Sequence, residues 1–445
     1  MSVSLTRQLV QELKNRLITR DDLDIATYYT LDFLGSYMGG GITSQGEKLR
    51  EYTRLIGDSG PEPEAFLAAA LSHITETDDL HRSSVTHPAC VVIPVALELA
   101  RHLDLTGKIA LESVVVGYET MIRIGDSLGS EHYKVFHNTA TAGVFGAASA
   151  AAYLLELNEN QWVWALGNAG TQASGLWQFN TDASMSKHLH AGHAAQAGIK
   201  AALLAMRDFT GPEFILEGDK GFYKGFCPNP SPEKVTERKS VWRIAETSIK
   251  PYPSCRHTHP AIDVALALRE ELLKKDVDLS KEIKSIKIFT YDTSRRFTDH
   301  NAPETTFAAK FSIQYCVVTA LLNGFPQLPD FEGDRLEETR KHPLVKSTQV
   351  VVDDVFDKKY PSEWGSAVEI TLNDGSVVRE ETFAAKGDPE KPVTMDELKS
   401  KVLGNFAYAG LAEDASTELF ELFKELKFAE EIPKLHWNSP SRNLK

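Results

Sequence analysis

The sequence predicts a mainly α-helical protein, with a large helical domain built from both chain ends and an α+β lid domain inserted between them. Three observations carry this prediction. Apolar residues recur at helical spacing from residue 4 to about 250, β-branched alternation follows in three later runs, and helical periodicity returns from residue 394. The predicted parts are 1–252 (helical domain, first part), 253–393 (α+β lid domain) and 394–445 (helical domain, C-terminal part).

The first part is predicted to be helical almost throughout, because Gly, Pro or Asn punctuates successive amphipathic stretches. Several stretches are rich in alanine, as in TAGVFGAASAAAYLL. Small side chains let helix axes approach closely, so these are expected to be interior helices of one bundle. The expected helices are 21–38, 62–75, 88–103, 108–126, 138–156, 159–171 and 187–207.

The lid domain begins after the proline-rich PYPSC at 251–255. One helix is expected at 260–274. The runs EIKSIKIFTY, TQVVVDDVF and SAVEITLNDGSVVREETF are typical of strands, and the last turns at Asn373-Asp374-Gly375. From TMDELKSKVLGNF at 394 the pattern is helical again, through 428.

Length and composition narrow the class of protein. The chain has 445 residues, too many for one ordinary core, with 42% hydrophobic and 25% charged residues. A net charge of −14 argues against a nucleic-acid or anionic-membrane partner, since either needs a basic face. No apolar run approaches the ~20 residues of a membrane span.

The four cysteines, Cys90, Cys227, Cys255 and Cys316, lie far apart without a C-x-x-C pair. This spacing fits neither a zinc knuckle nor a secreted disulfide framework. The N-terminal stretch MSVSLTRQLVQELKNRL has no apolar core of a signal peptide. We therefore expect a cytoplasmic protein with reduced thiols.

The tripeptide Thr-His-Pro occurs twice, with His87 and His259 at its centre, and each copy precedes an apolar helix. Proline fits the first helical turn and leaves the preceding histidine extended at the cap position. A helix N-terminus attracts carboxylates and disfavours imidazolium, so each histidine could act as a neutral base, or could simply cap its helix. Because one copy lies in each predicted domain, we expect a cleft between the domains.

Two further stretches place basic side chains at helix starts. His137 precedes Asn138, a potential cap, and Ser186 is expected to cap a helix that begins with Lys187. His190 lies one turn further along the Lys187 face. The alternatives are a surface lysine at 187 and a core histidine at 190.

The stretch TETDDLHRSSVTHPAC at 75–90 carries Asp78, Asp79, His81 and His87, residue types that also bind zinc, iron or manganese. No second histidine pair on one helix accompanies them, and DDLHR does not match the DDxxD magnesium pattern. No G-x-G-x-x-G after a strand, P-loop or G-x-S-x-G is present. What remains is cofactor-free proton transfer on an anionic substrate, with histidines as acid and base and with Lys187 and Arg256 as charge partners.

Taken together, several segments resemble the MmgE/PrpD family. They are DDLHRSSVTHP before an apolar helix, GYETMIRIG, HNTATAGVFGAASAAAYLLEL, GTQASGLWQF, SMSKHLHAGHAAQAGIKAALL and KPYPSCRHTHPAIDVALALR. The likeness is dense over residues 5 to about 275 and looser beyond. It implies the same helical-plus-lid fold, homodimerisation through the helical part, and metal-independent action on di- or tricarboxylates. The activities implied are 2-methylcitrate dehydratase, cis-aconitate decarboxylase or iminodisuccinate epimerase.

The resemblance also assigns roles to positions of this chain. His87 matches the active-site histidine of the family's THP turn, His137 the histidine before its Gly/Ala helix, and Lys187 the lysine of its S-K-x-L-H segment. The remaining matches are His259 to the lid-side histidine, Tyr315 to the tyrosine of F-x-x-Q-Y, and Asp78 and Asp79 to the aspartate pair. We expect His87, His137, Lys187 and Tyr315 to be catalytic, and Asp78, Asp79, His81, Arg256 and His259 to bind substrate.

One departure bears on the substrate. Decarboxylase-type members carry D-F-D-D-T where this chain has Glu76-Thr77-Asp78-Asp79-Leu80. The departure argues against cis-aconitate decarboxylation and leaves the substrate open.

The sequence therefore predicts a metal-independent, dehydratase-type lyase that moves a proton next to a carboxylate of a small polycarboxylate, without a cofactor. The alternatives are an isomerase or epimerase of a dicarboxylate such as iminodisuccinate, a metal-dependent hydrolase or hydratase using Asp78, Asp79, His81 and His87, and a non-catalytic carboxylate binder.

Overall fold

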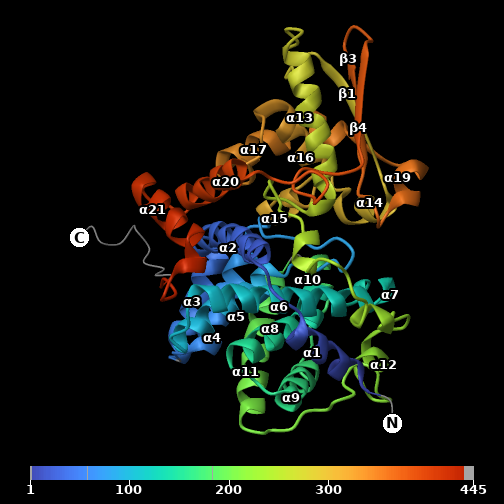
Figure 1. The fold of residues 1–445 in the computed structure, drawn as a ribbon. Coiled ribbons are helices and arrows are strands. Elements are labelled where there is room, and N and C mark those ends of the chain that lie inside the picture. The colour runs from blue at the N-terminus through green and yellow to red at the C-terminus, as the bar shows by residue number, and fades with distance from the viewer. Residues whose placement is uncertain (1–2, 58, 183, 435–445) are drawn as a thin grey trace. The chain divides into compact units, whose positions relative to one another are not determined.

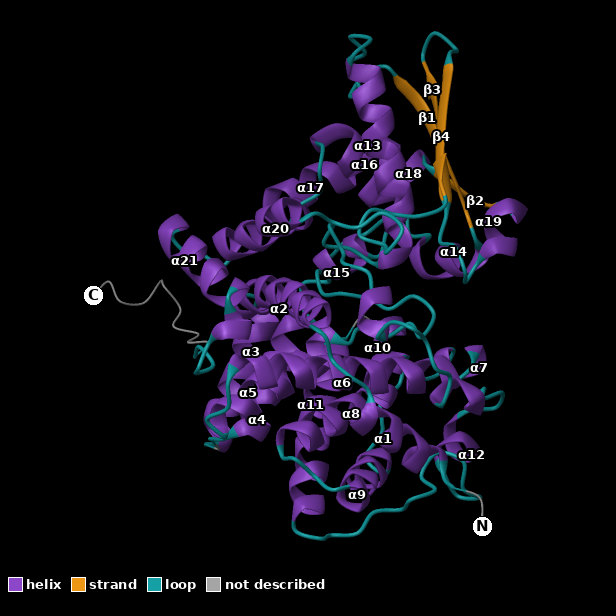
Figure 2. Ribbon diagram, in the orientation of Figure 1, coloured by secondary structure: helices purple, strands orange, loops and turns teal. Residues whose placement is uncertain are grey.

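The protein is mainly helical, with one small four-stranded sheet, in a computed structural model that describes residues 3–57, 59–182 and 184–434 (Figures 1 and 2). This confirms the predicted mainly α class. Contacts divide the chain into two compact units. Unit 1 runs up to Ile74, from Asp78 to Thr247 and from Met395 onward; unit 2 consists of Thr75–Thr77 and Ser248–Thr394.

Unit 1 contains α-helices and short 3-10 turns. Its α-helices are α1 (Leu5–Asn15), α2 (Arg20–Gly41), α3 (Ser44–Ile56), α4 (Pro61–Ser72), α5 (Ala89–His102), α6 (Gly107–Ser127), α7 (Ser130–Tyr133), α8 (Asn138–Leu154), α9 (Glu159–Gly170), α10 (Gln178–Thr181), α11 (Ser186–Met206), α12 (Phe222–Phe226), α20 (Met395–Tyr408) and α21 (Glu413–Lys424). Its 3-10 turns are η1 (Pro232–Val235), η2 (Arg243–Glu246) and η5 (Leu426–Phe428).

The alanine-rich helix α8 is the centre of unit 1, as the sequence predicted. It packs against α6, α11, α5 and α9, and nearly all of its residues are buried (Figure 1). Small side chains make this approach possible: a Cβ placed on Gly198 of α11 would lie 2.3 Å from the Cβ of Ala147. The close packing fixes the start of α8 relative to α5 and α11, which is where the candidate site residues lie.

The helices predicted in unit 1 lie within a few residues of their expected bounds, but three caps differ. Pro88 is the N-cap of α5 where His87 was expected, and Met185 is the N-cap of α11 where Ser186 was expected. His137 itself is the N-cap of α8, with an extended backbone (φ −79°, ψ 105°), whereas Asn138 was expected to fill that position. The Asn138 amide instead donates to the backbone oxygen of Ser84 at 2.8 Å. The side chain that could have capped α8 thus ties the helix to the polar stretch before α5.

Unit 2 combines helices with the sheet. Its elements are η3 (Arg256–Thr258), α13 (His259–Leu273), β1 (Ile283–Thr290), α14 (Asp292–Thr298), α15 (Thr306–Lys310), α16 (Ile313–Asn323), η4 (Leu328–Phe331), α17 (Gly333–Lys341), α18 (Pro343–Ser347), β2 (Gln349–Val352), α19 (Asp354–Lys359), β3 (Ser366–Leu372) and β4 (Val377–Thr382).

The sheet has the order β2-β1-β3-β4, drawn in orange in Figure 2. Strands β1 and β2 are parallel, while β3 pairs antiparallel with both β1 and β4. The predicted turn at 373–375 joins β3 to β4. Apolar side chains of β1 and β3 pack with α13 and α16 in one hydrophobic core, which gives unit 2 its own interior.

The run TQVVVDDVF was predicted to be a strand throughout, and the second half of that prediction is wrong. Strand β2 ends at Val352, and α19 begins at Asp354. The Asp353 carboxylate accepts a hydrogen bond from the backbone N–H of Val355 at 2.8 Å. A side-chain cap therefore overrides the β-branched pattern at this point.

None of the described helices combines the length and the apolar character that a membrane crossing requires.

Candidate active site

Four histidine rings meet inside unit 1. The ring of His73 lies 5.0 Å from that of His87 and is stacked 5.6 Å from that of His137, centroid to centroid. The ring of His137 lies 5.5 Å from that of His190. The structure thus brings together His87 and His137, both predicted from sequence, and adds His73 and His190.

Helix ends position these rings. His73 is the C-cap of α4, His137 is the N-cap of α8, and His87 immediately precedes Pro88, the N-cap of α5. The backbone N–H of His87 donates to the hydroxyl of Thr139 in α8 at 3.1 Å. Since two helix starts are linked here, their histidines cannot move independently.

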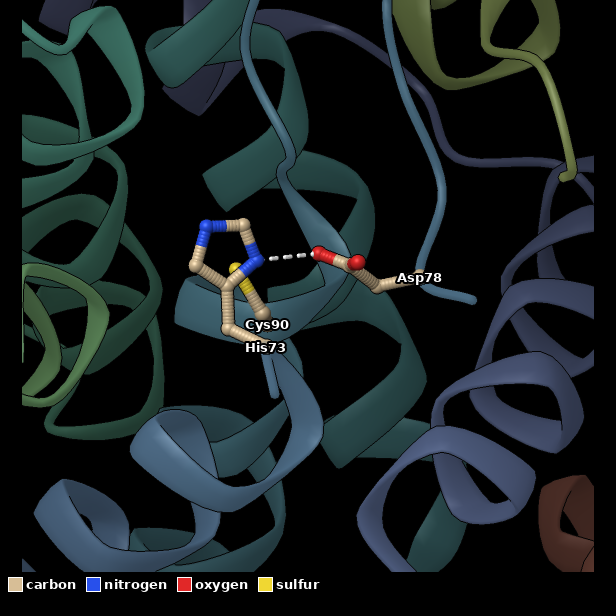
Figure 3. A group of neighbouring side chains, drawn as sticks. All are labelled: His73, Asp78 and Cys90. Atoms are coloured by element: carbon tan, nitrogen blue, oxygen red, sulfur yellow. Dashed lines mark hydrogen bonds and ion pairs between the residues drawn. The ribbon is translucent and has the colours of Figure 1, made fainter. Parts of the chain in front are cut away.

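Asp78 is the carboxylate of this cluster. Its Oδ2 accepts a hydrogen bond from Nδ1 of His73 at 2.6 Å (Figure 3) and lies 3.4 Å from Nδ1 of His87. The side chains of Asp78 and His73 are fully buried, whereas that of His87 is 12% exposed. One buried carboxylate therefore serves two imidazoles, of which only His87 retains access to solvent.

The hydrogen bonds of His87 fix which ring nitrogen is basic. Its Nδ1 contacts the backbone oxygen of Asp79, which can only accept, so Nδ1 carries the hydrogen. In the neutral ring, Nε2 then keeps its lone pair. Asp78 beside the same Nδ1 favours the imidazolium that forms when Nε2 takes up a proton. His87 is thus arranged as a base that acts through Nε2.

Asp79 is bound from two sides. Its Oδ1 accepts from the backbone N–H of Ala89 at 3.0 Å and its Oδ2 from the hydroxyl of Tyr118 at 2.8 Å. Burial, with the charge of Asp78, raises the pKa of Asp79 well above its usual value. Asp79 caps α5 and presents its backbone oxygen to His87, so its carboxylate acts within the protein framework.

His137 is surrounded by basic groups. Burial, followed by the charges of His73, His190, Lys187 and His87, holds its pKa well below 6.5. Burial, followed by His73, His193 and Lys187, lowers the pKa of His190 to about 4. The buried Lys187, 3% exposed, is therefore close enough to act on both rings electrostatically. His137 stays neutral at pH 7 and next to a cation.

A second set of residues could in principle hold a metal. Within the described residues, ligand atoms of His73, Asp78 and Cys90 lie within 4.8 Å of one another, all buried (Figure 3). Burial raises the pKa of the Cys90 thiol well above its usual value, with further increases from Asp78 and Asp79. A metal here would have to displace both that thiol proton and the proton shared by His73 and Asp78. The possible metal ligands named from the sequence, Asp78, Asp79, His81 and His87, have only Asp78 in common with this group.

His81 lies in unit 1 but is turned to other partners. Its Nδ1 is 2.9 Å from the hydroxyl of Ser84, and its Nε2 is 4.0 Å from a carboxylate oxygen of Glu246. The described contacts of its ring tie the loop before α5 to η2.

Arg256 and His259 belong to unit 2. Arg256 donates to Nδ1 of His259 at 2.8 Å, and its guanidinium also pairs with Asp388. The expectation that His259 is extended at a cap is wrong, because His259 is the first residue of α13 with helical backbone angles (φ −62°, ψ −42°). The 3-10 turn η3 leads directly into α13, and Thr258 closes that turn by donating to the backbone oxygen of Cys255 at 2.8 Å.

Tyr315 also belongs to unit 2, where it is fully buried in the core formed with the sheet. Its hydroxyl donates to the backbone oxygen of Asp330, and burial raises its pKa. The catalytic role that the resemblance gave to Tyr315 stays a prediction, as does the substrate-binding role of Arg256 and His259.

The two positions that depart from the decarboxylase pattern are both buried. Glu76 has a left-handed backbone (φ 59°), and its carboxylate accepts from the buried ammonium of Lys250 at 3.2 Å. Leu80 is 2% exposed in the core of unit 1. Glu76 therefore neutralises a buried cation of unit 2, and Leu80 adds apolar surface where the family pattern has a hydroxyl.

Sequence reasoning missed His73. It precedes the acidic stretch in SHITETDD and belongs to no repeated motif, so its pairing with Asp78 required the turn after α4. Sequence reasoning placed His190 on the same helix face as Lys187 but did not include it among the site residues. Trp177 and Phe179 were not named as site residues either. These two rings lie 5.0 Å and 6.0 Å from that of His137 and cover one side of it.

Comparison with protein families matches nearly the whole chain. Residues 7–234 match the MmgE/PrpD N-terminal domain, and residues 252–424 match the MmgE/PrpD C-terminal domain.

Relatives of two kinds match: two decarboxylases over most of their length, and a dehydratase over about half of its length. Cis-aconitate decarboxylase of Mus musculus is 26% identical over 388 residues, which cover 84% of this chain and 78% of that protein. The enzyme of the same name from Homo sapiens is 26% identical over 412 residues, covering 86% and 82%. The mitochondrial 2-methylcitrate dehydratase of Yarrowia lipolytica is 28% identical over 268 residues, covering 57% and 49%.

Proposed function

This chain belongs to the MmgE/PrpD family, and we propose that it is a metal-independent lyase of dehydratase type. Its proposed substrate is a small di- or tricarboxylate, from which it removes a proton next to a carboxylate and eliminates water. The relatives are named for acting on molecules of this class.

The observation that carries the proposal is the arrangement of His87. Its Nδ1 is held by the backbone oxygen of Asp79 and by Asp78, so that Nε2 is the basic nitrogen of the ring. Its ring is the partly exposed member of the buried His73–Asp78–His87 set. A histidine that is fixed in one tautomer and supported by a carboxylate is suited to abstract a proton.

Lys187 supplies the charge that the reaction needs. Removing a proton beside a carboxylate places a second negative charge on that carboxylate's oxygens. A buried ammonium stabilises this charge more than it stabilises the starting acid, because it is not screened by water. In the proposal, Lys187 therefore binds the substrate carboxylate and lowers the barrier to proton removal.

The elimination is completed at the neighbouring carbon. The C–H electron pair forms the new double bond, the C–O bond breaks, and the departing hydroxyl takes a proton and leaves as water. We assign that proton to His137, whose neutral ring carries one N–H, with Tyr315 as the alternative that the resemblance suggests. Asp78, Asp79 and His81 would support the histidines, while Arg256 and His259 would bind a further carboxylate.

Cis-aconitate decarboxylation is the second candidate. It is favoured by the coverage of the relatives, since those named cis-aconitate decarboxylase align with 84% to 86% of this chain and the Yarrowia dehydratase with 57%. The buried Glu76 and Leu80 stand against it. In this reaction a carboxylate leaves as carbon dioxide and a proton is added to carbon, so the same histidines would mainly donate.

We also propose that the protein is a cytoplasmic homodimer, as the family resemblance implies. Sedimentation equilibrium of the purified protein would measure a mass near twice 49.3 kDa if this is correct. A monomer at micromolar concentration would contradict it.

The function is tested by hydrogen exchange in D₂O. The purified protein is incubated separately with citrate, 2-methylcitrate, cis-aconitate and iminodisuccinate, and each acid is followed by NMR and mass spectrometry. Deuterium at the carbon next to a carboxylate, with an unsaturated acid formed, supports a dehydratase. Label with inverted configuration and no new product indicates an epimerase, and carbon dioxide release indicates the decarboxylase. A chain that labels none of these acids is a binder only.

Lys187→Met provides the matched test of the site. We expect it to lower the exchange rate by about 10²-fold or more, in the range found when one transition-state charge partner is removed. Lys200→Met, at an exposed position of the same helix, is the control and should leave the rate unchanged.

Metal independence is tested by elemental analysis and EDTA treatment of the purified protein. A stoichiometric metal whose removal abolishes activity would overturn it.

A further inference from the structure

The proposed role of His137 raises a question of proton supply. A neutral imidazole has one ring N–H, so once it gives that proton away it must gain another at its second nitrogen. His137 is 2% exposed, and its low pKa means that it does not hold a second proton in advance. Some neighbouring group has to deliver the replacement.

His190 is placed to do this. Its Nδ1 lies 3.3 Å from Nδ1 of His137, within hydrogen-bond distance. The two Nδ1 atoms can form a hydrogen bond only if one of them carries a hydrogen and the other does not. The two neutral rings therefore adopt complementary tautomers. If His190 donates, the hydrogen of His137 is on Nε2, where it can be given to a substrate.

The surroundings hold this pair in place. The backbone N–H of His137 donates to the oxygen of Gly175 at 3.0 Å, and the backbone at Gly175 has a φ of +127°. A Cβ at Gly175 would lie 2.5 Å from the Cβ of Ala140 and 3.3 Å from Nδ1 of His190. The ring of Phe179 lies 5.4 Å from that of His190 and also contacts His137. The loop before α11 therefore closes over both rings.

The two histidines differ in their access to water. His137 is buried, whereas His190 is intermediate in exposure. Only His190 can therefore exchange protons with solvent without passing through the substrate position. The basic groups around the pair (His73, His87, His193 and Lys187) disfavour a lasting charge on either ring. Protons that pass in one concerted step avoid such a charge.

We propose that His190 is a positioning residue that sets the tautomer of His137 and relays protons to it from solvent. In one turnover, His190 Nε2 accepts a proton from water while Nδ1–H of His190 passes to Nδ1 of His137, and Nε2–H of His137 passes to the departing hydroxyl. Each ring gains one proton and loses one, and the net transfer is one proton from solvent to the leaving group. This step reverses the tautomer of both rings. After the product has left, water that enters the site gives a proton to Nε2 of His137, Nδ1–H of His137 returns to Nδ1 of His190, and Nε2–H of His190 passes to solvent, so both rings regain their starting tautomers. This inference deepens the proposed function and relies on it only for the role of His137.

The first test needs no substrate. In protein labelled with ¹⁵N in the histidine rings, the Nδ1 signals of His137 and His190 should show one protonated and one unprotonated nitrogen near pH 7. Exchange of the His137 ring hydrogen with solvent should slow at least tenfold in His190→Gln, because glutamine can hydrogen-bond but cannot relay a proton through a second ring nitrogen. Two protonated or two unprotonated Nδ1 atoms, or unchanged exchange, would overturn the inference.

His193→Gln is the matched control. It lies on the same helix, and its Nε2 makes a hydrogen bond of 3.0 Å with the backbone oxygen of Gln172, which is outside the pair. This variant should leave the exchange of the His137 hydrogen at the wild-type rate. If it slows exchange as much as His190→Gln does, the effect belongs to the helix in general and the relay is wrong.

The second test uses whichever acid of the D₂O panel is turned over. His190→Gln should lower the ratio of water eliminated to deuterium incorporated by about 10-fold or more, because His87 still removes the proton but His137 is not resupplied. Added imidazole should restore part of the rate in His190→Ala. A ratio equal to that of the wild type in both variants would contradict the relay. A panel without any labelled acid would reject the proposed function and leave the ring-exchange result to decide on the relay.

Discussion

The two Thr-His-Pro turns share a tripeptide but leave their histidines with opposite chemistry. At the first turn, Nδ1 of His87 donates to the backbone oxygen of Asp79. At the second, Nδ1 of His259 accepts from the guanidinium of Arg256, which can only donate, and Nε2 faces the backbone oxygen of Ser254 at 3.3 Å. The basic nitrogen is therefore Nε2 in His87, whereas in His259 it is Nδ1, which accepts from Arg256.

The neighbours of the tripeptide make this difference. An acidic pair precedes the first turn, so the ring of His87 faces a carboxylate and a carbonyl. Arg256 precedes the second, so the ring of His259 faces a cation. Exposure follows the same division: the His87 side chain is 12% exposed, and His259 is fully buried. The motif places a histidine at a helix start, and the flanking charges decide whether it is a base.

The largest expected effect is on the base itself. His87→Gln should lower the rate of α-hydrogen exchange by about 10²–10⁴-fold, the usual contribution of a general acid or base. His259→Gln should act on KM rather than kcat, because its proposed role is to support a carboxylate-binding arginine. Steady-state kinetics with the acid identified by deuterium labelling would measure both.

A strong effect on kcat at the second turn would contradict the expected difference between the two histidines. If His259→Gln lowers kcat as strongly as His87→Gln while KM is unchanged, then the second turn also supplies a catalytic group. Circular dichroism and thermal unfolding of both variants would show that the folded state is retained.

A smaller effect is expected from the carboxylate beside the first turn. Asp78→Asn keeps the shape of the side chain but removes the charge that supports His73 and His87. We expect kcat to fall by about 10- to 100-fold, with less change in KM, since a general base weakened in this way still has its ring in place. Asp388→Asn, which removes the carboxylate paired with Arg256, is the matching change at the second turn and should mainly raise KM.

The sequence predicted the helices that carry the site better than the contacts between the histidine rings. The periodicity of α8 and α11 and the Thr-His-Pro turns were sufficient to place His87, His137 and Lys187 at helix starts. They could not reveal His73, because its contact with Asp78 depends on the C-terminal turn of α4 and on close packing between helices. They also could not predict the helical backbone of His259, since a preceding 3-10 turn overrides the preference of residues before proline for extended structure. Local pattern predicts where an element begins, and contacts between elements decide which ring nitrogen of a histidine is basic.

Acid should destabilise both regions, because each contains histidines whose pKa is lowered by burial. Burial, with Arg256 and Lys250, lowers the pKa of His257 to about 3, and that of the half-buried His190 is lowered to about 4. As pH falls below 6.5, the unfolded chain takes up protons that the folded chain excludes, so stability is lost until each folded pKa is reached. His257 alone would contribute about 1.4 kcal/mol per pH unit in that window.

Denaturant unfolding between pH 7.5 and 5 would measure this dependence. His257 lies stacked 4.4 Å from the ring of Trp364, so His257→Phe retains an aromatic ring there while removing the titrating group. We expect this variant and His190→Gln to flatten the acid dependence to a similar extent, because both folded pKa values lie below this window. Equal acid dependence in the wild type and in His257→Phe would show that this ring is protonated without cost in the folded state.

The smallest expected effect concerns the support of the first turn from α6. Tyr118→Phe removes the hydroxyl that donates to Asp79 Oδ2 and keeps the ring in the core. The folded state should lose about 1–3 kcal/mol, the cost of leaving a buried acceptor without one partner. Activity should change little, because Oδ1 of Asp79 still caps α5 and its backbone oxygen still orients His87.

Tyr153→Phe, which removes a partly buried hydrogen bond to Glu112, is the control and should lower the stability of the folded state by less. A fall in kcat in Tyr118→Phe as large as that in Asp78→Asn would mean that the Asp79 carboxylate, and not only its backbone, takes part in the chemistry of His87.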